Sequence, residues 1–207
     1  MKADLSRAAT VLLGTAATAL VLGGAGLVLG VGLEAPLLWG FGLACLLSVA
    51  PSFALGLRVR WGLGNRGLDG ERRTLRITGH LLRLLALLLA IASVLAWTDG
   101  TRFTPGAAVL TLSGAATVIW LGLWSLHRPL ADLHPSLALA AARTRTLAEL
   151  AGLVLAGSLL GLLAPWAGST AGLALALRIF LAGRAVGQGT SVSLVGCGGC
   201  GGGCGCG

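Results

Sequence analysis

The chain has 207 residues, of which 56% are hydrophobic and only 11% charged, and its mean hydropathy is +0.90. Water-soluble domains carry charge on about a quarter of their residues, so this composition excludes an ordinary soluble globular domain. The net charge of +8 comes almost entirely from arginines at the ends of apolar segments, which indicates membrane orientation and lipid headgroups rather than nucleic acid.

Three long runs without a charged residue predict transmembrane helices. They cover residues 8–33, 35–57 and 103–126, and each reaches the roughly 20 apolar residues that cross a bilayer. The first run is longer than the apolar part of a signal peptide, which has roughly 7–15 residues, so we expect a retained helix over 8–31. The second run predicts a helix over 36–57 after a very short turn.

The basic stretch 58–76 comes next, and its glycines predict a loop. The third helix is predicted over 77–98 and must include His80 and Arg83, because its charge-free part alone is too short to span a bilayer. Arg76, His80 and Arg83 are spaced by four and three residues, so they share one helix face near the membrane boundary.

The second half of the chain predicts three more helices. The fourth covers 104–126, and the segment after it contains two prolines. The later part of that segment, 135–145, predicts an interfacial helix that leads into the next span. The fifth helix, 147–163, and the sixth, 171–187, are joined by the tight turn APWAGST.

Glycines four residues apart mark predicted packing faces. The segments 26–30, 157–161 and 183–187 each fit the pattern G-x-x-x-G, which lets transmembrane helices approach closely. Because the chain has 34 glycines, several such matches arise by chance. Packing between helices of one chain is the first interpretation, and a dimer face is the alternative.

The basic residues predict the orientation of these six helices. With both termini on one side, that side holds thirteen basic residues: Lys2, Arg7, Arg58, Arg60, Arg66, Arg72, Arg73, Arg76, Arg83, Arg128, Arg143, Arg145 and Arg184. The other side holds only Arg102, and Arg178 lies within the membrane. The positive-inside rule therefore places both termini in the cytoplasm. A five-helix alternative is disfavoured because it would send the C-terminal basic residues and the tail outside.

Together these elements predict an all-α integral protein of the cytoplasmic (inner) membrane, with about six transmembrane helices arranged as three helical hairpins. Residues 1–187 form the predicted transmembrane domain. Residues 188–207 form a flexible, disordered Gly/Cys-rich cytoplasmic tail, because glycine-rich segments without bulky residues do not fold alone. The lipid bilayer is the expected partner, and no nucleic acid is expected.

Arg178 is the sharpest chemical feature inside the predicted membrane. A charged residue at depth costs about 3 kcal/mol on insertion scales and is a functional hypothesis by default. The alternative is that a short or tilted helix lets its side chain reach the headgroups. The sequence places Glu149 level with Arg184 and predicts an ion pair between them. Arg178 would then lie about 12 Å nearer the turn and meet backbone carbonyls, a lipid phosphate or an anionic ligand.

The remaining charged and polar residues predict no catalysis. His127 and His134 flank a proline-containing loop and are expected to be solvated. Carboxylates are missing from the predicted helix centres, which argues against a proton pump. The sequence has no H-E-x-x-H and no phosphate-binding glycine loop with its lysine, so we expect a protein that is not an enzyme. Lipid headgroups are the expected partners of four arginines: Arg72, Arg73, Arg76 and Arg83.

The last twelve residues, GCGGCGGGCGCG, contain four of the five cysteines: Cys197, Cys200, Cys204 and Cys206. Thiolates at this spacing bind a soft ion such as Zn²⁺ or Cu(I), although a glycine chain does not pre-organise the site. A cytoplasmic location would keep the thiols reduced. Three interpretations remain: a flexible tail with opportunistic metal binding, a dedicated metal or redox site, and chemical modification. The last rests on the Gly/Cys alternation, which resembles in composition the core peptides of thiazole-modified bacterial natural products.

Two classes of function follow from the sequence. The first is an accessory or anchoring subunit whose cysteine-rich tail binds a soft metal ion or a membrane or cytoplasmic protein partner. The alternative is a small transporter or channel subunit in which Arg178 lines the path. A polar cavity between the helices would favour the second class, and a solid Leu/Gly-packed bundle would favour the first.

Overall fold

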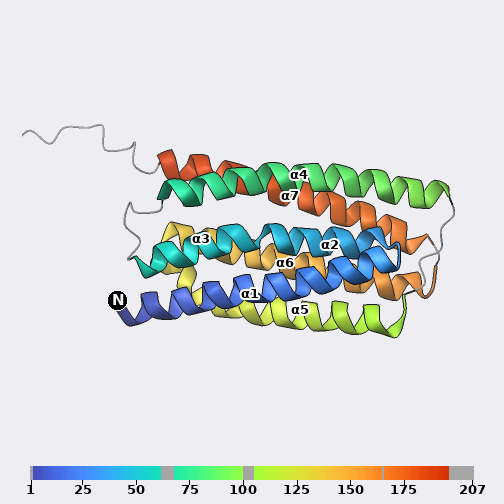
Figure 1. Cartoon of the computed structure of the whole chain (residues 1–207), viewed down its shortest axis with the longest axis horizontal. Helices are drawn as coiled ribbons and strands as arrows, with labels where there is room; N and C mark the ends of the chain where they lie inside the picture. The colour runs from blue at the N-terminus through green and yellow to red at the C-terminus, as the bar shows by residue number, and fades with distance from the viewer. Residues whose placement is uncertain (1, 62–67, 100–104, 165, 196–207) are drawn as a thin grey trace, which may run out of the picture.

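The computed structural model describes residues 2–61, 68–99, 105–164 and 166–195, and in these ranges every regular element is a helix. The all-α prediction is confirmed for this part of the chain. The helices lie side by side along one long axis (Figure 1). They are, in chain order, α1 (Lys2–Gly32), α2 (Pro36–Leu47), α3 (Val49–Arg60), α4 (Leu68–Thr98), α5 (Ala107–His127), the 3-10 helix η1 (Arg128–Leu133), α6 (Pro135–Gly161) and α7 (Ala167–Val195).

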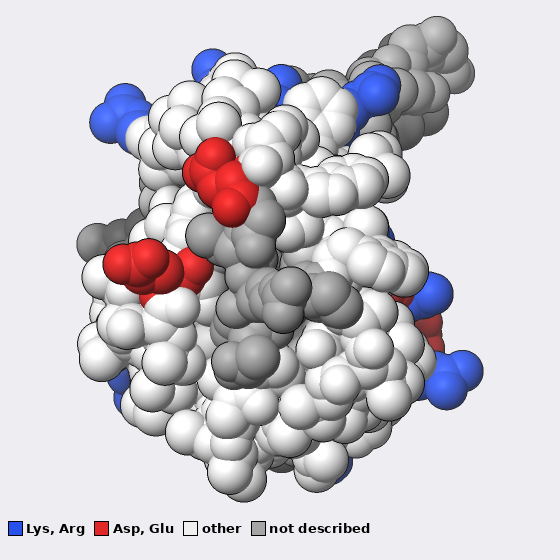
Figure 2. All heavy atoms as spheres, turned by 90° about the vertical axis from the view of Figure 1, so that its right-hand side faces the viewer, with Lys and Arg blue, Asp and Glu red and all other residues white. Residues whose placement is uncertain are grey.

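The two ends of the bundle differ in charge. The turn end, on the right of Figure 1, holds the α1–α2 turn, the end of α4 and the α6–α7 turn. Seen from that end, the surface is mostly uncharged with a few acidic groups, and basic groups lie at its margin (Figure 2). We call the opposite end the arginine end. The helix segments near it carry most of the described basic residues: Arg7, Arg58, Arg60, Arg72, Arg73, Arg76, Arg128, Arg143, Arg145 and Arg184.

The helices have the lengths and surfaces of membrane spans. Large apolar side chains face outward, among them Val28 at 73% exposure and Leu87 at 59%. Exposed apolar surface of this extent is unusual for a soluble monomer, so the chain is compatible with a multi-pass membrane protein. Five segments are long and apolar enough to cross a membrane: Leu5–Gly32, Pro36–Arg60, Leu68–Thr98, Ala107–Leu133 and Ala167–Gly187.

The predicted second helix is broken at Ser48 into α2 and α3. Pro51 explains the break, because it has no N–H to donate to the carbonyl of Leu47 four residues earlier. The hydroxyl of Ser48 donates to the Ala44 carbonyl at 2.9 Å, and this back-bonding is common where helices bend. The two halves still form one apolar pass of the bundle.

Other predicted boundaries differ from the structure. Helix α4 begins at Leu68, so the segment expected to be a loop up to residue 76 is helical over most of its second half. Asp69 and Glu71 in its first turn favour this start, because acids stabilise the positive end of the helix dipole. The expected interfacial helix 135–145 and the fifth predicted span form one continuous helix, α6.

Helix α7 begins at Ala167, four residues before the predicted start. It also continues to Val195, so the first eight residues assigned to the tail are helical. The glycine-rich segment 196–207 lies outside the described residues, and the prediction of disorder there stays a prediction.

The glycine pairs on α1 and α7 pack between helices of this chain, as predicted. A Cβ atom at Gly26 of α1 would lie 3.3 Å from the Cα of Gly42 on α2. On α7, a Cβ at Gly183 would lie 2.9 Å from the backbone oxygen of Gly79 on α4. Glycine is therefore needed where these helix backbones touch.

Candidate functional site

A cavity of about 360 Å³ lies inside the bundle between α6 and α7. Near the turn end these helices are in close contact, because a Cβ added to Gly157 of α6 would collide with the Cβ of Ala171 on α7. Toward the arginine end they spread apart (Figure 1), and the cavity occupies the space between them. Its other walls come from the α2–α3 break and from α4: Ala44, Ser48, Pro51, Thr78 and Leu82.

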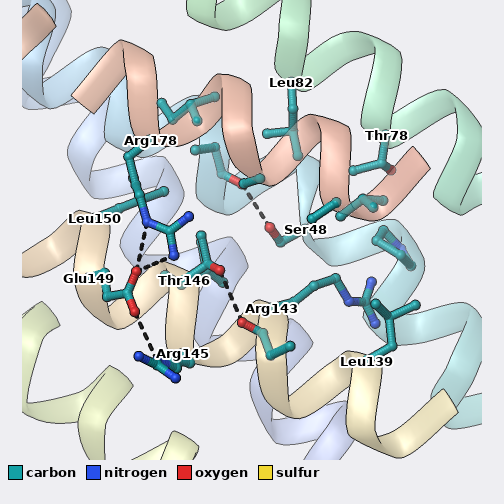
Figure 3. A pocket seen from close by; sticks show the side chains of 18 residues that line it. Ser48, Thr78, Leu82, Leu139, Arg143, Arg145, Thr146, Glu149, Leu150 and Arg178 are labelled. Atoms are coloured by element: carbon teal, nitrogen blue, oxygen red, sulfur yellow. Dashed lines mark hydrogen bonds and ion pairs between the residues drawn. The ribbon is translucent and has the colours of Figure 1, made fainter. Parts of the chain in front are cut away.

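The end of this cavity nearer the turn end, which we call its deep end, is lined by three charged side chains (Figure 3), of which Arg145 is 64% exposed. Arg178 of α7 donates from Nε to Oε2 of Glu149 on α6 at 2.7 Å, and its Nη2 donates to the same oxygen. Arg145, one turn before Glu149, donates from Nε to Oε1 at 2.9 Å. The Arg145 guanidinium also lies 5.9 Å from the ring centre of Trp124 on α5, within the range of a cation–π contact. One carboxylate is thus shared by two guanidinium groups.

The structure corrects the predicted partners of both Glu149 and Arg178. Glu149 pairs with Arg178 and Arg145 rather than with Arg184, and Arg178 meets a carboxylate of its own chain. Glu149 lies twelve residues before Gly161, the end of α6, and Arg178 lies eleven residues after Ala167, the start of α7. The two are therefore level in the hairpin, whereas the prediction placed Arg178 about 12 Å nearer the turn. The earlier start of α7, four residues before the predicted one, accounts for about 6 Å of this difference.

Glu149 also lies nearer the middle of its helix than the sequence predicted. Twelve residues of helix place it about 18 Å from the turn end of the bundle. The expectation that no carboxylate lies near a helix centre is therefore wrong. Glu149 and Arg178 keep 34% and 33% of their side-chain surface exposed, so both remain accessible from the cavity.

The hydroxyl groups that line the cavity already donate to backbone carbonyls. Ser48 donates to Ala44, Thr146 donates to the Ala142 carbonyl at 3.0 Å, and Thr78 of α4 donates to the Leu47 carbonyl at 3.5 Å. Most of the other lining side chains are alanine, leucine, isoleucine or valine. The arginines are consequently the main donors that the cavity offers to a ligand.

Arg143 is the lining arginine that stands apart from this group. Its guanidinium lies beside Leu139 rather than beside Glu149 (Figure 3). Its Nε and Nη1 atoms are buried, and within the described part of the chain neither has a hydrogen-bond partner. Buried N–H groups without hydrogen-bond partners are costly, so Arg143 has two donors that a ligand in the cavity could satisfy.

A second polar cluster lies nearby at the arginine end. Arg58 of α3 forms an ion pair with Glu71 of α4, and both side chains are only 6% exposed. Arg58 also donates to the hydroxyl of Ser136 at 3.1 Å. His134 caps α6, because its Nδ1 accepts a hydrogen bond from the backbone N–H of Ser136 at 3.1 Å. This cluster ties α3, α4 and the start of α6 together.

The expectation of solvated loop histidines is wrong for His127. That side chain is 1% exposed, and its Nδ1 lies 2.9 Å from the backbone oxygen of Leu123. Within the described ranges, no three His, Cys, Asp or Glu side chains are grouped to hold a metal ion. The four tail cysteines lie outside those ranges, and the other cysteine, Cys45, is buried in α2.

The predicted headgroup-binding arginines all lie on α4. Arg73 and Arg76 are exposed, while Arg72 and Arg83 are partly buried. Arg83 is partly covered because its side chain lies against Gly183 and Gly187 of α7. Arg184, the predicted partner of Glu149, is exposed and does not line the cavity.

Sequence reasoning missed Arg143 and the role of Glu149 in the cavity. Arg143 was counted only as a basic residue at the membrane boundary. Its place in the cavity depends on the continuous helix α6 and on the break between α2 and α3. The one signal in the sequence was Pro51, which predicts a break in the helix that forms the opposite wall.

No known protein-family model matches this chain, and no curated protein matches it significantly.

Proposed function

We propose that this protein is a membrane protein that binds an anion in the cavity between α6 and α7, as a small transporter or channel subunit would. The cavity carries this proposal, because its lining has three arginines and one glutamate. If these groups are ionised, the lining has an excess of two positive charges. Charged groups in a cavity between the helices favour this class over an anchoring subunit.

The proposal includes six membrane passes: the five apolar segments named above, in which α2 and α3 share one pass, and α6 in addition. Arg178 and Glu149 lie about 16–18 Å from the turn end, which is near the middle of a hydrocarbon layer about 30 Å thick. An ion pair at that depth is expensive, and such residues commonly mark solute pathways. The excess of basic residues supports a cytoplasmic arginine end in the inner membrane, with the cavity opening toward that side.

Flux through reconstituted vesicles tests this proposal. We expect proteoliposomes with the wild-type protein to release radiolabelled phosphate or chloride faster than protein-free vesicles. Arg178→Leu should reduce that release to the protein-free level, because it removes the charge at the deep end. Arg184→Leu is the matched control, since Arg184 is on the same helix but does not line the cavity.

The experiment has clear contrary outcomes. Release of neither anion by the wild-type protein, or equal release by wild type and Arg178→Leu, would contradict the proposal. A loss of folding in Arg178→Leu is checked with the double variant Arg178→Leu/Glu149→Gln, which removes both charges of the pair.

The role proposed for the tail is separate. It rests on the four cysteines of the sequence "GCGGCGGGCGCG". The intact mass of the native protein would distinguish free thiols, bound metal, modification and clipping. A metal content that is unchanged when all four cysteines are replaced by serine would exclude Zn²⁺ or Cu(I) at this tail.

A further inference from the structure

We propose that Arg143 is the main anion-binding residue of the cavity and that its ligand is a phosphate group. This inference rests on the proposed function and deepens it, because it names both the chemical class of the ligand and the place where it binds. Arg178, the residue that the sequence singled out, is instead paired with Glu149 of its own chain.

The first argument is the contrast between these two arginines. The Nε and Nη2 groups of Arg178 both donate to Glu149, so the charge of Arg178 is compensated within the chain. Arg143 Nε and Nη1 are buried and have no hydrogen-bond partner among the described residues. An anion that accepts from either group would reduce the cost of its burial, which gives Arg143 the larger gain from binding.

The second argument concerns the type of ligand. The hydroxyls of Ser48, Thr78 and Thr146 use their hydrogens on backbone carbonyls, so the donors left for a ligand are guanidinium N–H groups. Such a site favours a ligand that only accepts hydrogen bonds. In Arg143, Nε–H and Nη1–H each share an edge of the guanidinium with Nη2, and such an edge matches two oxygens of one phosphate, which is why arginine is common at phosphate sites.

The third argument concerns the source of the phosphate. Most of the cavity wall is apolar, including Leu82, Leu139 and Val186. A phosphate group attached to an apolar body would therefore fit both parts of the wall, while free inorganic phosphate would use only the arginine. The shared chemistry is the phosphate, and the experiment below separates a lipid headgroup from the free ion.

Binding is measured on the full-length protein in detergent with two pairs of probes. Inorganic phosphate is compared with chloride at equal ionic strength, using the shift in the midpoint of thermal unfolding. Phosphatidic acid is compared with diacylglycerol of the same chains, using native mass spectrometry, because the two lipids differ only in the phosphate. We expect at least one phosphate-bearing probe to bind better than its partner. Phosphate alone would identify a free anion, and phosphatidic acid alone would identify a lipid.

Substitutions of Arg143 test whether this residue binds the phosphate. Arg143→Gln should weaken that binding by about tenfold or more, the loss typical of one charge-assisted contact. It should not lower the unfolding midpoint of the ligand-free protein, because it removes two buried N–H groups that lack hydrogen-bond partners. Arg143→Lys should bind with intermediate affinity, because it keeps the charge but loses the two-pronged geometry. Arg184→Gln is the control and should bind as wild type.

Two results of the binding measurements would overturn the inference. In the first, the wild type does not distinguish either phosphate-bearing probe from its partner; in the second, Arg143→Gln and Arg143→Lys both bind like wild type. Failure of this inference differs from failure of the proposed function. Anion flux that persists in Arg143→Gln overturns only the role of Arg143. Phosphate binding that depends on Arg143, without flux in wild type, overturns only the transport function.

Discussion

Arg58 of α3 and Glu71 of α4 form an ion pair in which each side chain is only 6% exposed. These helices are joined by a short connection, and the pair fixes how they meet at the arginine end. Both charges have left water, so each depends on the other and on neighbours such as Ser136. The pair is therefore a sensitive point of the fold.

Replacing Glu71 with glutamine should destabilise the protein strongly. The guanidinium of Arg58 would remain buried without its carboxylate, a change that typically costs about 3–5 kcal/mol. The measurement is the free energy of unfolding in detergent. Asp69→Asn is the matched control, because Asp69 is in the same helical turn but exposed, and we expect a change within about 0.5 kcal/mol. Equal effects of the two substitutions would show that the pair contributes no specific stability.

Replacing Thr78 with valine should cost little, and the cost should depend on Pro51. Thr78 Oγ1 donates to the Leu47 carbonyl, the acceptor that Pro51 leaves without a helix N–H. Hydrogen bonds between membrane helices average about 0.6 kcal/mol, and we expect a loss of that size. In the Pro51→Ala background the new N–H can reach the Leu47 carbonyl, so Thr78→Val should then have a smaller effect. A double-mutant cycle of unfolding free energies measures this coupling, and strict additivity would contradict it.

The helices themselves were predictable, whereas the partners across them were not. Charge-free runs located the apolar segments because the length and hydropathy of a membrane-spanning helix can be read from the sequence. Pairing of Glu149 with Arg178 depends on where α7 begins, and a change of four residues moves a side chain by one turn. The buried position of Arg143 depends on the spreading of α6 from α7, which no local pattern encodes. Similarly, Thr78 and Leu47 meet only after the fold has formed.

Replacing Gly42 with alanine should disrupt the contact between α1 and α2. A Cβ atom there would lie 2.5 Å from the backbone nitrogen of Leu27 and 2.8 Å from the backbone oxygen of Gly23. Backbone atoms of a packed helix cannot give way as a flexible side chain can, so we expect a loss of about 1–3 kcal/mol. Gly24→Ala is the control, because nothing lies within 4 Å of its Cβ position. Thermal unfolding midpoints that fall equally in both variants would contradict close helix packing as the reason for glycine.

Stability should fall as the pH is lowered through the range in which His134 titrates. The neutral ring caps α6 by accepting the N–H of Ser136 at Nδ1. Burial lowers the pKa of His134 below its usual value of 6.5, and the charge of Arg58 lowers it further, while Glu71 acts in the opposite direction. Because the folded pKa is below the unfolded one, the unfolded chain binds more protons on acidification. The loss therefore begins near pH 6.5 and levels off below the folded pKa.

Two substitutions separate the cap from the charge of His134. His134→Asn keeps a side-chain acceptor for the Ser136 N–H but does not titrate, so its unfolding midpoint should vary less between about pH 8 and 5. His134→Ala should lose about 1 kcal/mol already at neutral pH, because the cap is gone, and should also lose the pH dependence. An unchanged pH dependence in both variants would assign it to other groups. Nδ1 of His134 accepts the Ser136 N–H only while the ring is neutral. This one atom therefore accounts for both the stability of the cap and its dependence on pH.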